Sequence, residues 1–367
     1  MKYKILLLAL WLIVFNYACH HPVKNEIIPE SRHLNADIVC IYFFQFQDKF
    51  DIGIQRNGHT FMIDPLQLQG AVILKNGHLF MVDPENAGRM YVFNIKTGQT
   101  NLLQTEQPDY FSTNDATRYA DVLGQHLPLS YFHFYVRNYF QYTLENDKVK
   151  LDRQNFRLKG IYISNAKQVN ENQYVTLGFF RTGLLGLYDG KSKEMKYYGH
   201  YPISVDIPFE SSAMEQIVQS FQGNIAYSDV HSKVVYSSSN FAYLSCYQFT
   251  GKKLTFQWEK HIVPPPATQI VDGTLESDKT VAQGGFSDVA IAGDYIFACY
   301  TQTNIVDSIP DNTHSILVYD MDGNLVATFQ IDYSISGIMV DMEEGSIYGI
   351  SREYYNPVIV KFHFGKI

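Results

Sequence analysis

The sequence predicts an all-β fold, a six-bladed β-propeller of four-stranded antiparallel blades that is closed by an N-terminal strand. Three observations lead to this prediction. Aromatic residues make up 15% of the 367 residues and charged residues only 18%, a balance that favours strands over charged amphipathic helices. Hairpin-like segments recur along the chain, and the last of them is one strand short.

The recurring unit is an apolar strand, a tight polar turn that usually contains Gly, and a second strand. Alternating apolar residues around Thr-Gly or Asp-Gly are typical of antiparallel hairpins, because such turns need residues that tolerate a positive φ. The copies lie at residues 90–103, 138–152, 184–198, 244–258, 316–329 and 356–367. Their turns span 267 residues from Gly98 to Gly365 in five intervals, a mean of about 53. Four-stranded blades repeat every 40 to 50 residues or so, which indicates six blades with some long connections.

An inner hairpin precedes the outer one at residues 70–83, 288–301 and 336–351, and two hairpins make one blade. The sixth copy stops just after its turn, whereas the strand-like run "DIVCIYFFQF" at 37–46 has no partner. We therefore expect a strand from residues 37–64 to pair with the last blade and close the ring, which removes two exposed sheet edges.

The first 18 residues have the features of a secretory signal peptide. Lys2 and Lys4 precede an apolar run of 11 residues, 5–15, which is shorter than the roughly 20 residues that a membrane-spanning helix needs. Ala18-Cys19 resembles the end of a bacterial lipobox, although Asn16 departs from that motif, and ordinary signal peptidase cleavage after Ala18 is the alternative.

We expect Cys19 to be the lipidated first residue of the mature chain. Residues 19–36 then form a flexible tether, and residues 37–367 form a single propeller domain. A metal site at Cys19 and the two histidines that follow it is the weaker interpretation, because acylation consumes the thiol. The protein would be exported and anchored in the bacterial cell envelope, facing the periplasm or the surface.

Charge and cysteine content exclude some classes of function. The net charge of −8 does not favour binding to the negatively charged phosphate backbone, so nucleic-acid binding is not expected. Cys40, Cys246 and Cys299 lie in apolar strand-like runs without CxxC or CxxH spacing, which indicates buried thiols rather than zinc ligands. A single disulfide among them stays open.

Two insertions interrupt the repeat. Residues 208–221 carry apolar residues at helical spacing, with Ser212 and Glu215 at the spacing of a capping box, and predict one short helix. Residues 261–285 contain three consecutive prolines without a sustained period and predict a long loop. Long loops on a rigid ring commonly line a binding face, although an insertion away from any site explains them equally well.

These hairpins, together with "FQGNIAYSDVHSKVVYSSS" at 221–239, resemble the TolB-like six-bladed β-propeller lipoproteins of bacterial envelopes. The resemblance covers the signal segment, the tether and most of residues 40–367. Its motifs are structural, so it implies the fold and the envelope location but no catalytic residues.

Three aspartates occur in similar local sequences, "YADV", "YSDV" and "FSDV", and could place Asp121, Asp229 and Asp288 around a channel that binds a hard cation. Register argues against a shared site. Asp229 follows an inner strand whereas Asp288 starts one, so the two should lie at opposite faces of the ring. Repeated turn chemistry explains the three copies better, and we expect no metal site and no cofactor.

A binding site, if present, should lie where connections enter the innermost strands and converge on the axis. The channel-lining candidates by strand placement are Gln69, Lys159, Ser287, Asp288 and Ser336. For each of them, an ordinary strand-capping role is the stronger interpretation and a functional role the weaker one.

Two functions fit these features. No nucleophile elbow, phosphate loop, HExxH or EF-hand pattern occurs, which favours a lipid-anchored binding or scaffold module for an envelope protein, a glycan or a small ligand over an enzyme. The alternative is a propeller hydrolase that resembles calcium-dependent lactonases, but Asp288 has no recognisable Glu and Asn partners at equivalent strand starts.

Overall fold

The structure is a computed structural model. It describes residues 31–40, 163–202, 211–262, 283–304, 311–351 and 358–367, and elsewhere between 54 and 277 only the strands named below. These residues form six sheets of four or more strands, which we number as blades 1 to 6 in chain order. The outer hairpins predicted at 90–103, 138–152, 184–198, 244–258 and 316–329 are all strand pairs.

Apart from the two N-terminal strands described below, the strands of each blade follow one another from the innermost to the outermost and pair antiparallel. Blade 1 contains β5 (Val72–Lys75), β6 (His78–Val82), β7 (Arg89–Asn94) and β8 (Thr100–Gln104). Blade 2 contains β9 (Tyr119–Val122), β10 (Leu129–His133), β11 (Asn138–Glu145) and β12 (Lys148–Arg157). Blade 3 contains β13 (Ile163–Asn170), β14 (Gln173–Gly178), β15 (Leu185–Asp189) and β16 (Glu194–Tyr198).

The second half of the chain repeats this order. Blade 4 contains β17 (Gly223–Ser228), β18 (Lys233–Ser238), β19 (Tyr243–Phe249) and β20 (Leu254–His261). Blade 5 contains β23 (Gln283–Ala292), β24 (Tyr295–Asn304), β25 (Asp311–Asp320) and β26 (Leu325–Ile331). Blade 6 contains β27 (Ile335–Asp341), β28 (Ser346–Ser351) and β29 (Val358–His363).

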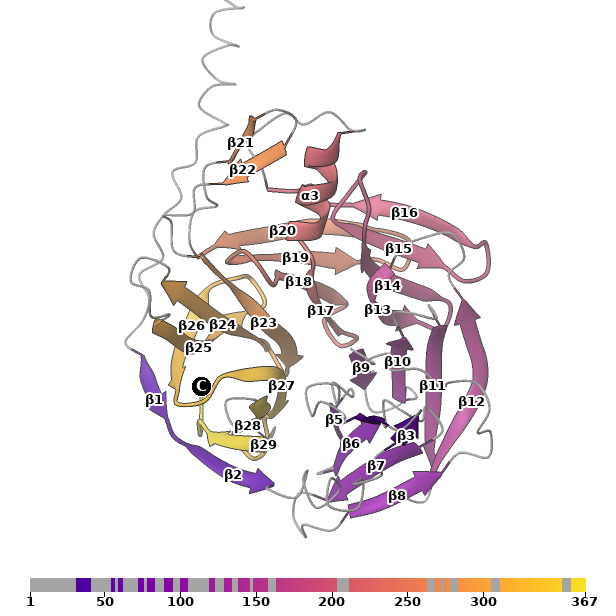
Figure 1. Cartoon of the computed structure of the whole chain (residues 1–367), viewed down its shortest axis with the longest axis vertical. Coiled ribbons are helices and arrows are strands. Elements are labelled where there is room, and N and C mark those ends of the chain that lie inside the picture. The colour runs from indigo at the N-terminus through magenta and orange to yellow at the C-terminus, as the bar shows by residue number, and fades with distance from the viewer. Residues whose placement is uncertain are drawn as a thin grey trace, which may run out of the picture.

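The six blades form a ring around a central axis (Figure 1). The innermost strands contact one another in the order β5, β9, β13, β17, β23, β27 and back to β5. This arrangement confirms the predicted six-bladed β-propeller.

The N-terminal region supplies a strand to each of the last two blades. β2 (Ala36–Cys40) pairs antiparallel with β29 and gives blade 6 its fourth strand, as expected for the region after residue 37. β1 (Arg32–Leu34) pairs parallel with β26 and becomes the fifth strand of blade 5. Whether β2 is what closes the ring stays a prediction. Residues 32–34, which belong to the predicted tether 19–36, thus lie in a strand, and Leu34 is buried against blades 5 and 6.

The core lies between the faces of neighbouring blades. Side chains of a strand alternate between its two faces, so Tyr236 packs toward blade 3 whereas Val235, one residue earlier, packs toward blade 5. Because both faces are covered, β14 and β19 are almost continuously buried, whereas the outer strand β16 is largely exposed. Each fully buried large apolar side chain contributes about 1.5–3 kcal/mol.

The predicted helix is α3 (Ser212–Ser220), and its apolar side places Met214, Ile217 and Val218 in the core. Its N-cap is Ser211, whose Oγ accepts a hydrogen bond from the N–H of Met214 at 3.2 Å. The expected capping by Ser212 is therefore wrong by one residue, because Ser211 is the last residue with extended backbone angles. No helix in the described part of the chain is long and apolar enough to cross a membrane.

The predicted loop at 261–285 contains a hairpin of β21 (Thr268–Val271) and β22 (Thr274–Ser277). The Asp-Gly pair between the two strands is a strong hairpin signal that the preceding prolines obscured. A separate hairpin joins β3 (Ile54–Arg56) and β4 (His59–Phe61).

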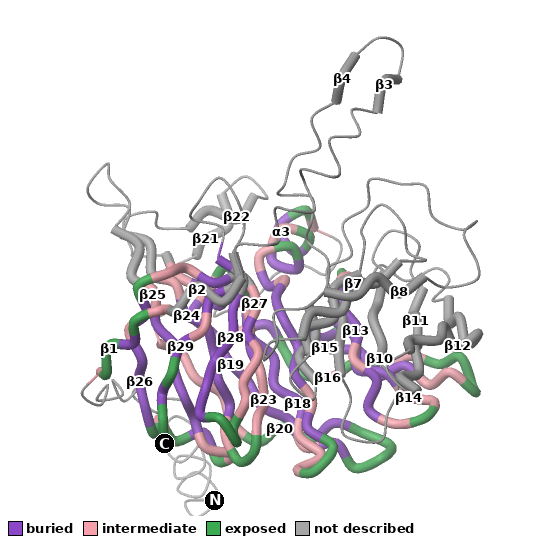
Figure 2. The backbone as a smooth tube through the Cα atoms, turned by 90° about the horizontal axis from the view of Figure 1, so that it is seen from below, coloured by how far each residue is buried: buried purple, intermediate pink, exposed green. Residues whose placement is uncertain are grey.

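The ring has two different faces. α3 and β22 contact each other, and β21 and β22 lie with α3 on one side, which we call the helix face (Figure 2). The opposite side, the turn face, carries the tight turns at 190–193, 229–232, 250–253, 293–294, 321–324 and 342–345. The C-terminus lies at the turn face (Figure 2), where the N–H of Gly365 donates to the carbonyl oxygen of Gly345.

Candidate functional site

The predicted channel residues are described to different extents. Ser287 and Asp288 lie in β23 with their side chains described. Ser336 lies in β27, where only its backbone is described. Gln69, Lys159 and the predicted lipidation residue Cys19 lie outside the described residues.

Three serines occupy equivalent positions in the innermost strands of blades 3, 5 and 6. Ser164, Ser287 and Ser336 each lie where the register of their strand with its hairpin partner shifts. A bulge of this kind leaves a residue out of the regular ladder and re-aims its side chain. The innermost strands of these three blades therefore share a bulge that contains a serine.

Two of these bulged serines, Ser164 and Ser287, bond to the next blade around the ring. Ser164 Oγ donates to Gln222 Oε1, directly before β17, at 2.5 Å. Ser287 Oγ donates to the carbonyl oxygen of Ile335, at the start of β27, at 2.8 Å. Blade 4 has an amide in this role, because Asn224 Nδ2 donates to the carbonyl oxygen of Ser287 at 3.0 Å. Side-chain hydrogen bonds thus join blades 3, 4, 5 and 6 near the axis.

Asp288 adds a second bond between blades 5 and 6. Its Oδ1 accepts the N–H of Val289 at 2.8 Å, and its Oδ2 accepts the N–H of Ile338 in β27 at 3.0 Å. Hydrogen bonds from N–H groups to a carboxylate are stronger than those between neutral groups. The geometry therefore assigns both Ser287 and Asp288 to blade-to-blade attachment.

The three similar aspartates occupy three different settings. Asp229 follows β17 in a turn at the turn face, where its Oδ1 accepts the N–H of Val230. Asp288 lies in the interior of β23 rather than at its start, and Asp121 lies in β9. Among the described residues, no group of three or more His, Cys, Asp or Glu side chains could hold a metal ion.

On the helix face, Gln222 connects blade 3 to α3. Besides accepting from Ser164, its Nε2 donates to the carbonyl oxygens of Val218 at 2.8 Å and Gly178 at 3.3 Å. Nearby, Arg181 in the β14–β15 loop lies 2.5 Å from Glu215 of α3. Both side chains are partly exposed, and Phe179 in the same loop is 37% exposed. An aromatic ring thus lies on the surface in the same loop as an ion pair.

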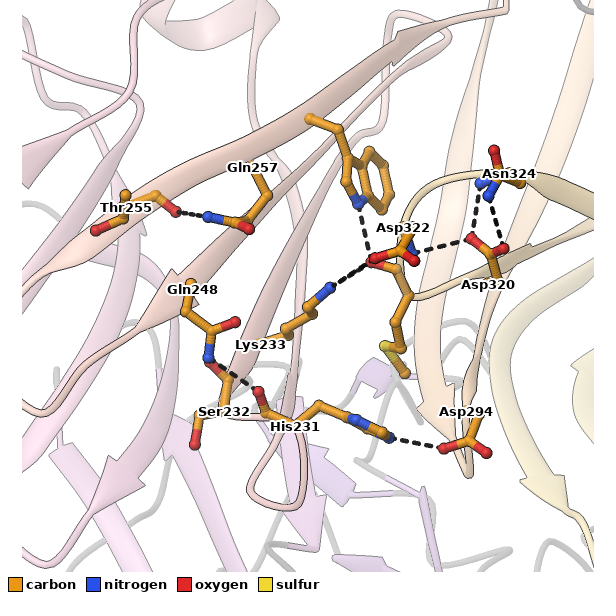
Figure 3. Close-up of polar contacts among 12 residues, drawn as sticks. His231, Ser232, Lys233, Gln248, Thr255, Gln257, Asp294, Asp320, Asp322 and Asn324 are labelled. Atoms are coloured by element: carbon orange, nitrogen blue, oxygen red, sulfur yellow. Dashed lines mark hydrogen bonds and ion pairs between the residues drawn. The ribbon is translucent and has the colours of Figure 1, made fainter.

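On the turn face, polar contacts join blades 4 and 5 (Figure 3). The carbonyl oxygen of Met321 accepts from Lys233 Nζ and, at 3.1 Å, from Trp258 Nε1. His231 Nε2 lies 3.0 Å from Asp294 Oδ1. These contacts involve tight turns, so the turn face is a second line of attachment between blades.

Buried ionisable groups between the blades remain protonated at neutral pH. Burial raises the pKa of Cys246 to about 12 and the pKa of Tyr247 to about 12. Cys246 and Cys299 are buried free thiols, as the sequence predicts. The thiolate is the nucleophilic form of cysteine, so these two residues are poor nucleophiles.

Glu259, in the outermost strand of blade 4, is a carboxylate whose pKa is lowered rather than raised. A hydrogen bond from His261, with another from Tyr243, lowers the pKa of Glu259 despite partial burial. Tyr243 OH lies 2.9 Å from Glu259 Oε2, and His261 Nε2 lies 3.5 Å from Glu259 Oε1. Glu259 is therefore ionised at neutral pH and holds two aromatic side chains.

Sequence reasoning missed Ser164, Asn224 and Gln222. The available signal was an apolar residue followed by Ser and then Asn, Asp or Gly, which occurs as "ISN" at 163, "FSD" at 286 and "ISG" at 335. The similarity of "FSDV" to "YSDV" instead grouped Asp288, which lies inside a strand, with Asp229, which lies in a turn.

A sequence model of the TolB-like 6-blade propeller-like family matches residues 129–343, which is more than half of the chain. The chain belongs to this family. Among proteins with curated functions, none matches the sequence.

Two solved structures are similar to this chain to different extents. A member of the DUF4221 family from Bacteroides vulgatus has a TM-score of 0.52 at 10% identity, covering 81% of this chain and 91% of that one. An auxiliary nutrient binding protein from Bacteroides thetaiotaomicron has a TM-score of 0.44 at 10% identity, covering 80% of this chain and 69% of that one. At these identities, the first structure supports the fold alone.

Proposed function

We propose that this protein is an exported propeller, anchored to the cell envelope through lipid on Cys19, that binds an envelope protein, a glycan or a small ligand on its helix face. The proposal rests on the different roles of the polar residues near the axis and of the two insertions on the helix face. Polar side chains near the axis attach blade to blade, whereas α3 and β21–β22 are inserted on one face and are not needed to form a blade.

The helix face has surface chemistry suited to recognition. Phe179 offers an exposed ring for stacking or apolar contact, and Arg181 and Glu215 offer charged hydrogen-bonding groups beside it. Aromatic and arginine side chains are the residues that most often dominate binding energy at protein interfaces. Gln222 bonds to Gly178, directly before the loop that carries Phe179 and Arg181, and to Val218 of α3, which links the loop and the helix.

The binding proposal is tested with the purified protein, envelope glycan fragments and candidate envelope proteins, measured by calorimetry. We expect a ligand whose affinity falls at least tenfold in Phe179→Ala and in Arg181→Ala. The matched control is Val230→Ala on the turn face, where the side chain is 84% exposed and binding should not change. A ligand lost equally in all three variants, or only in the control, would contradict a site on the helix face.

A hydrolase is the competing outcome of the same experiment. The protein is incubated with lactones in the presence of added calcium, and turnover is measured. Turnover that Asp288→Ala abolishes while Asp322→Ala preserves it would replace the binding proposal.

The anchor is tested separately. Growth with labelled palmitate should label the protein, and Cys19→Ala should remove the label and release the protein from membranes. A mature N-terminus without lipid would sink this part of the proposal and leave the binding face untouched.

A further inference from the structure

The first described strand enters the propeller from the turn face. β26 starts after the turn at 321–324 and runs toward the helix face, and β1 is parallel to it, with Arg32 opposite Phe329 and Leu34 opposite Ile331. Arg32 therefore lies nearer the turn face than Leu34 does. Arg32 also donates to the carbonyl oxygen of Lys366 at 3.4 Å, and the C-terminal residues lie beside the turn at 342–345 through the bond from Gly365 N–H to Gly345.

Several contacts hold this entry point in place. The guanidinium of Arg32 lies 5.3 Å from the centre of the Phe329 ring, and Leu34 is buried between blades 5 and 6. The N–H of Ala36 donates to both carboxylate oxygens of Asp332, at 3.1 and 3.2 Å. The chain is thus fixed from Arg32 onward, first to the outer edge of blade 5 and then to that of blade 6.

Little chain remains between this point and the proposed anchor. Residues 20–31 separate Cys19 from Arg32, twelve residues that reach at most about 40 Å when fully extended. A lipid on Cys19 would therefore hold the outer edge of blade 5 within about 40 Å of the bilayer. β1 runs away from the turn face and Arg32 bonds to Lys366 in the C-terminal segment at that face, so the chain before Arg32 approaches from the turn-face side.

We propose that the turn face lies against the membrane and that the helix face points away from it, toward soluble or surface-bound partners. This orientation rests on the proposed attachment upstream of Arg32, and it deepens the proposed function by stating from which side a ligand arrives. The partner of the turn face is the lipid surface itself.

The charges of the turn face indicate that the tether, rather than electrostatic attraction, sets this orientation. Its described turns on blades 3 and 4 expose Lys191, Lys193, Lys252 and Lys253 together with the acidic residues Glu171 and Asp229. On blades 5 and 6 they expose Asp294, Asp322 and Glu343. The described turns thus offer no continuous patch of one sign, so salt should have little effect on the orientation.

Energy transfer to the membrane tests the orientation. The full chain is reconstituted in phosphatidylcholine vesicles that contain a lipid with an acceptor dye on its head group. A donor dye is attached through an azide-bearing amino acid placed at Val230 on the turn face or at Glu215 on the helix face. Both positions belong to blade 4 or its helix and are well exposed, so they differ mainly in face. Lys191 and Phe179 of blade 3 provide a second pair if one labelled variant fails to fold.

We expect at least twofold more transfer from Val230 than from Glu215, at both low and high salt. Equal transfer, or more transfer from Glu215, on vesicles that carry the protein would overturn the orientation while leaving the anchor intact. The mass of the N-terminal peptide from the same sample reports lipid on Cys19 independently. Failure of the protein to float with vesicles would overturn both the anchor and the orientation.

Discussion

Individual polar side chains near the axis act as connectors between blades. Asp288 illustrates this, because one of its oxygens bonds within β23 and the other accepts the N–H of Ile338 in the next blade. A backbone N–H that loses its acceptor inside a protein costs more free energy than the bond itself contributes. The carboxylate is therefore a stability determinant whatever else it does.

We predict that Asp288→Ala lowers the free energy of unfolding by about 1–3 kcal/mol. Asp322→Ala is the matched control, because Asp322 is 88% exposed and lies 3.9 Å from Lys233, and it should change stability by less than about 0.5 kcal/mol. Urea unfolding followed by the fluorescence of Trp258, the only tryptophan after Trp11, measures both. Equal effects of the two substitutions would show that Asp288 does not connect blades.

Glu259 gives a prediction for pH. Its pKa is lowered in the folded protein by His261 and Tyr243, so its contribution to stability is present above its unfolded-state pKa and is lost as pH falls through the folded one. The wild type should lose stability below pH 5, and Glu259→Gln should flatten that loss. Unfolding midpoints from pH 7 to pH 3 test this, and identical pH profiles would contradict it.

The residue scale also shows why sequence patterns mislead. "FSDV" and "YSDV" share three letters, yet Asp288 lies within a bulged inner strand and Asp229 lies in a turn. Bulge position depends on pairing with a neighbouring strand, which local sequence does not specify. The correct equivalents of Ser287 are Ser164 and Ser336, and only the register reveals them.

At the scale of elements, the hairpins were predictable because their turns carry their own signal. Gly323 has a φ of +84°, Gly251 of +78° and Gly345 of +65°, and each follows or ends an apolar strand. Gly323 does more than turn the chain, since a Cβ there would meet the Trp258 ring at 2.7 Å. The turn of blade 5 therefore packs directly on blade 4.

We predict that Gly323→Ala destabilises the protein by about 2–4 kcal/mol, through the cost of the positive φ and the overlap with Trp258. Gly251→Ala is matched in φ but has no atom within 4 Å of its Cβ, and it should cost only about 1 kcal/mol. Thermal unfolding compares the two. The emission of Trp258 should shift only in Gly323→Ala, and a shift in both variants would argue against the contact.

The insertions were harder to predict than the blades. The helix was expected because Met214, Ile217 and Val218 recur at helical spacing, although its cap moved by one serine. The hairpin β21–β22 was missed because three prolines dominate the segment before it. Neither insertion is part of the repeating hairpin pattern. Their positions on the ring therefore cannot be predicted from that pattern.

At the scale of the whole molecule, repetition made the fold predictable and the candidate site largely unpredictable. Six hairpins and a missing last strand are sufficient to indicate six blades. The site depends on contacts between blades that are far apart in sequence, such as Ser164 with Gln222 or Asn224 with Ser287, and no local pattern encodes them. For the same reason, the sequence did not predict that the N-terminal region supplies one strand to blade 5 and another to blade 6.

The central claim is that residues 31–40 complete blades 5 and 6 by pairing with β26 and β29. Amide hydrogen exchange of the full chain, of a variant lacking residues 31–40 and of a control lacking residues 20–30 tests it directly. We predict that removal of 31–40 abolishes protection in β26 and β29 together with cooperative unfolding, whereas the control keeps both. Protection of β26 and β29 that survives the loss of 31–40 would contradict the claim.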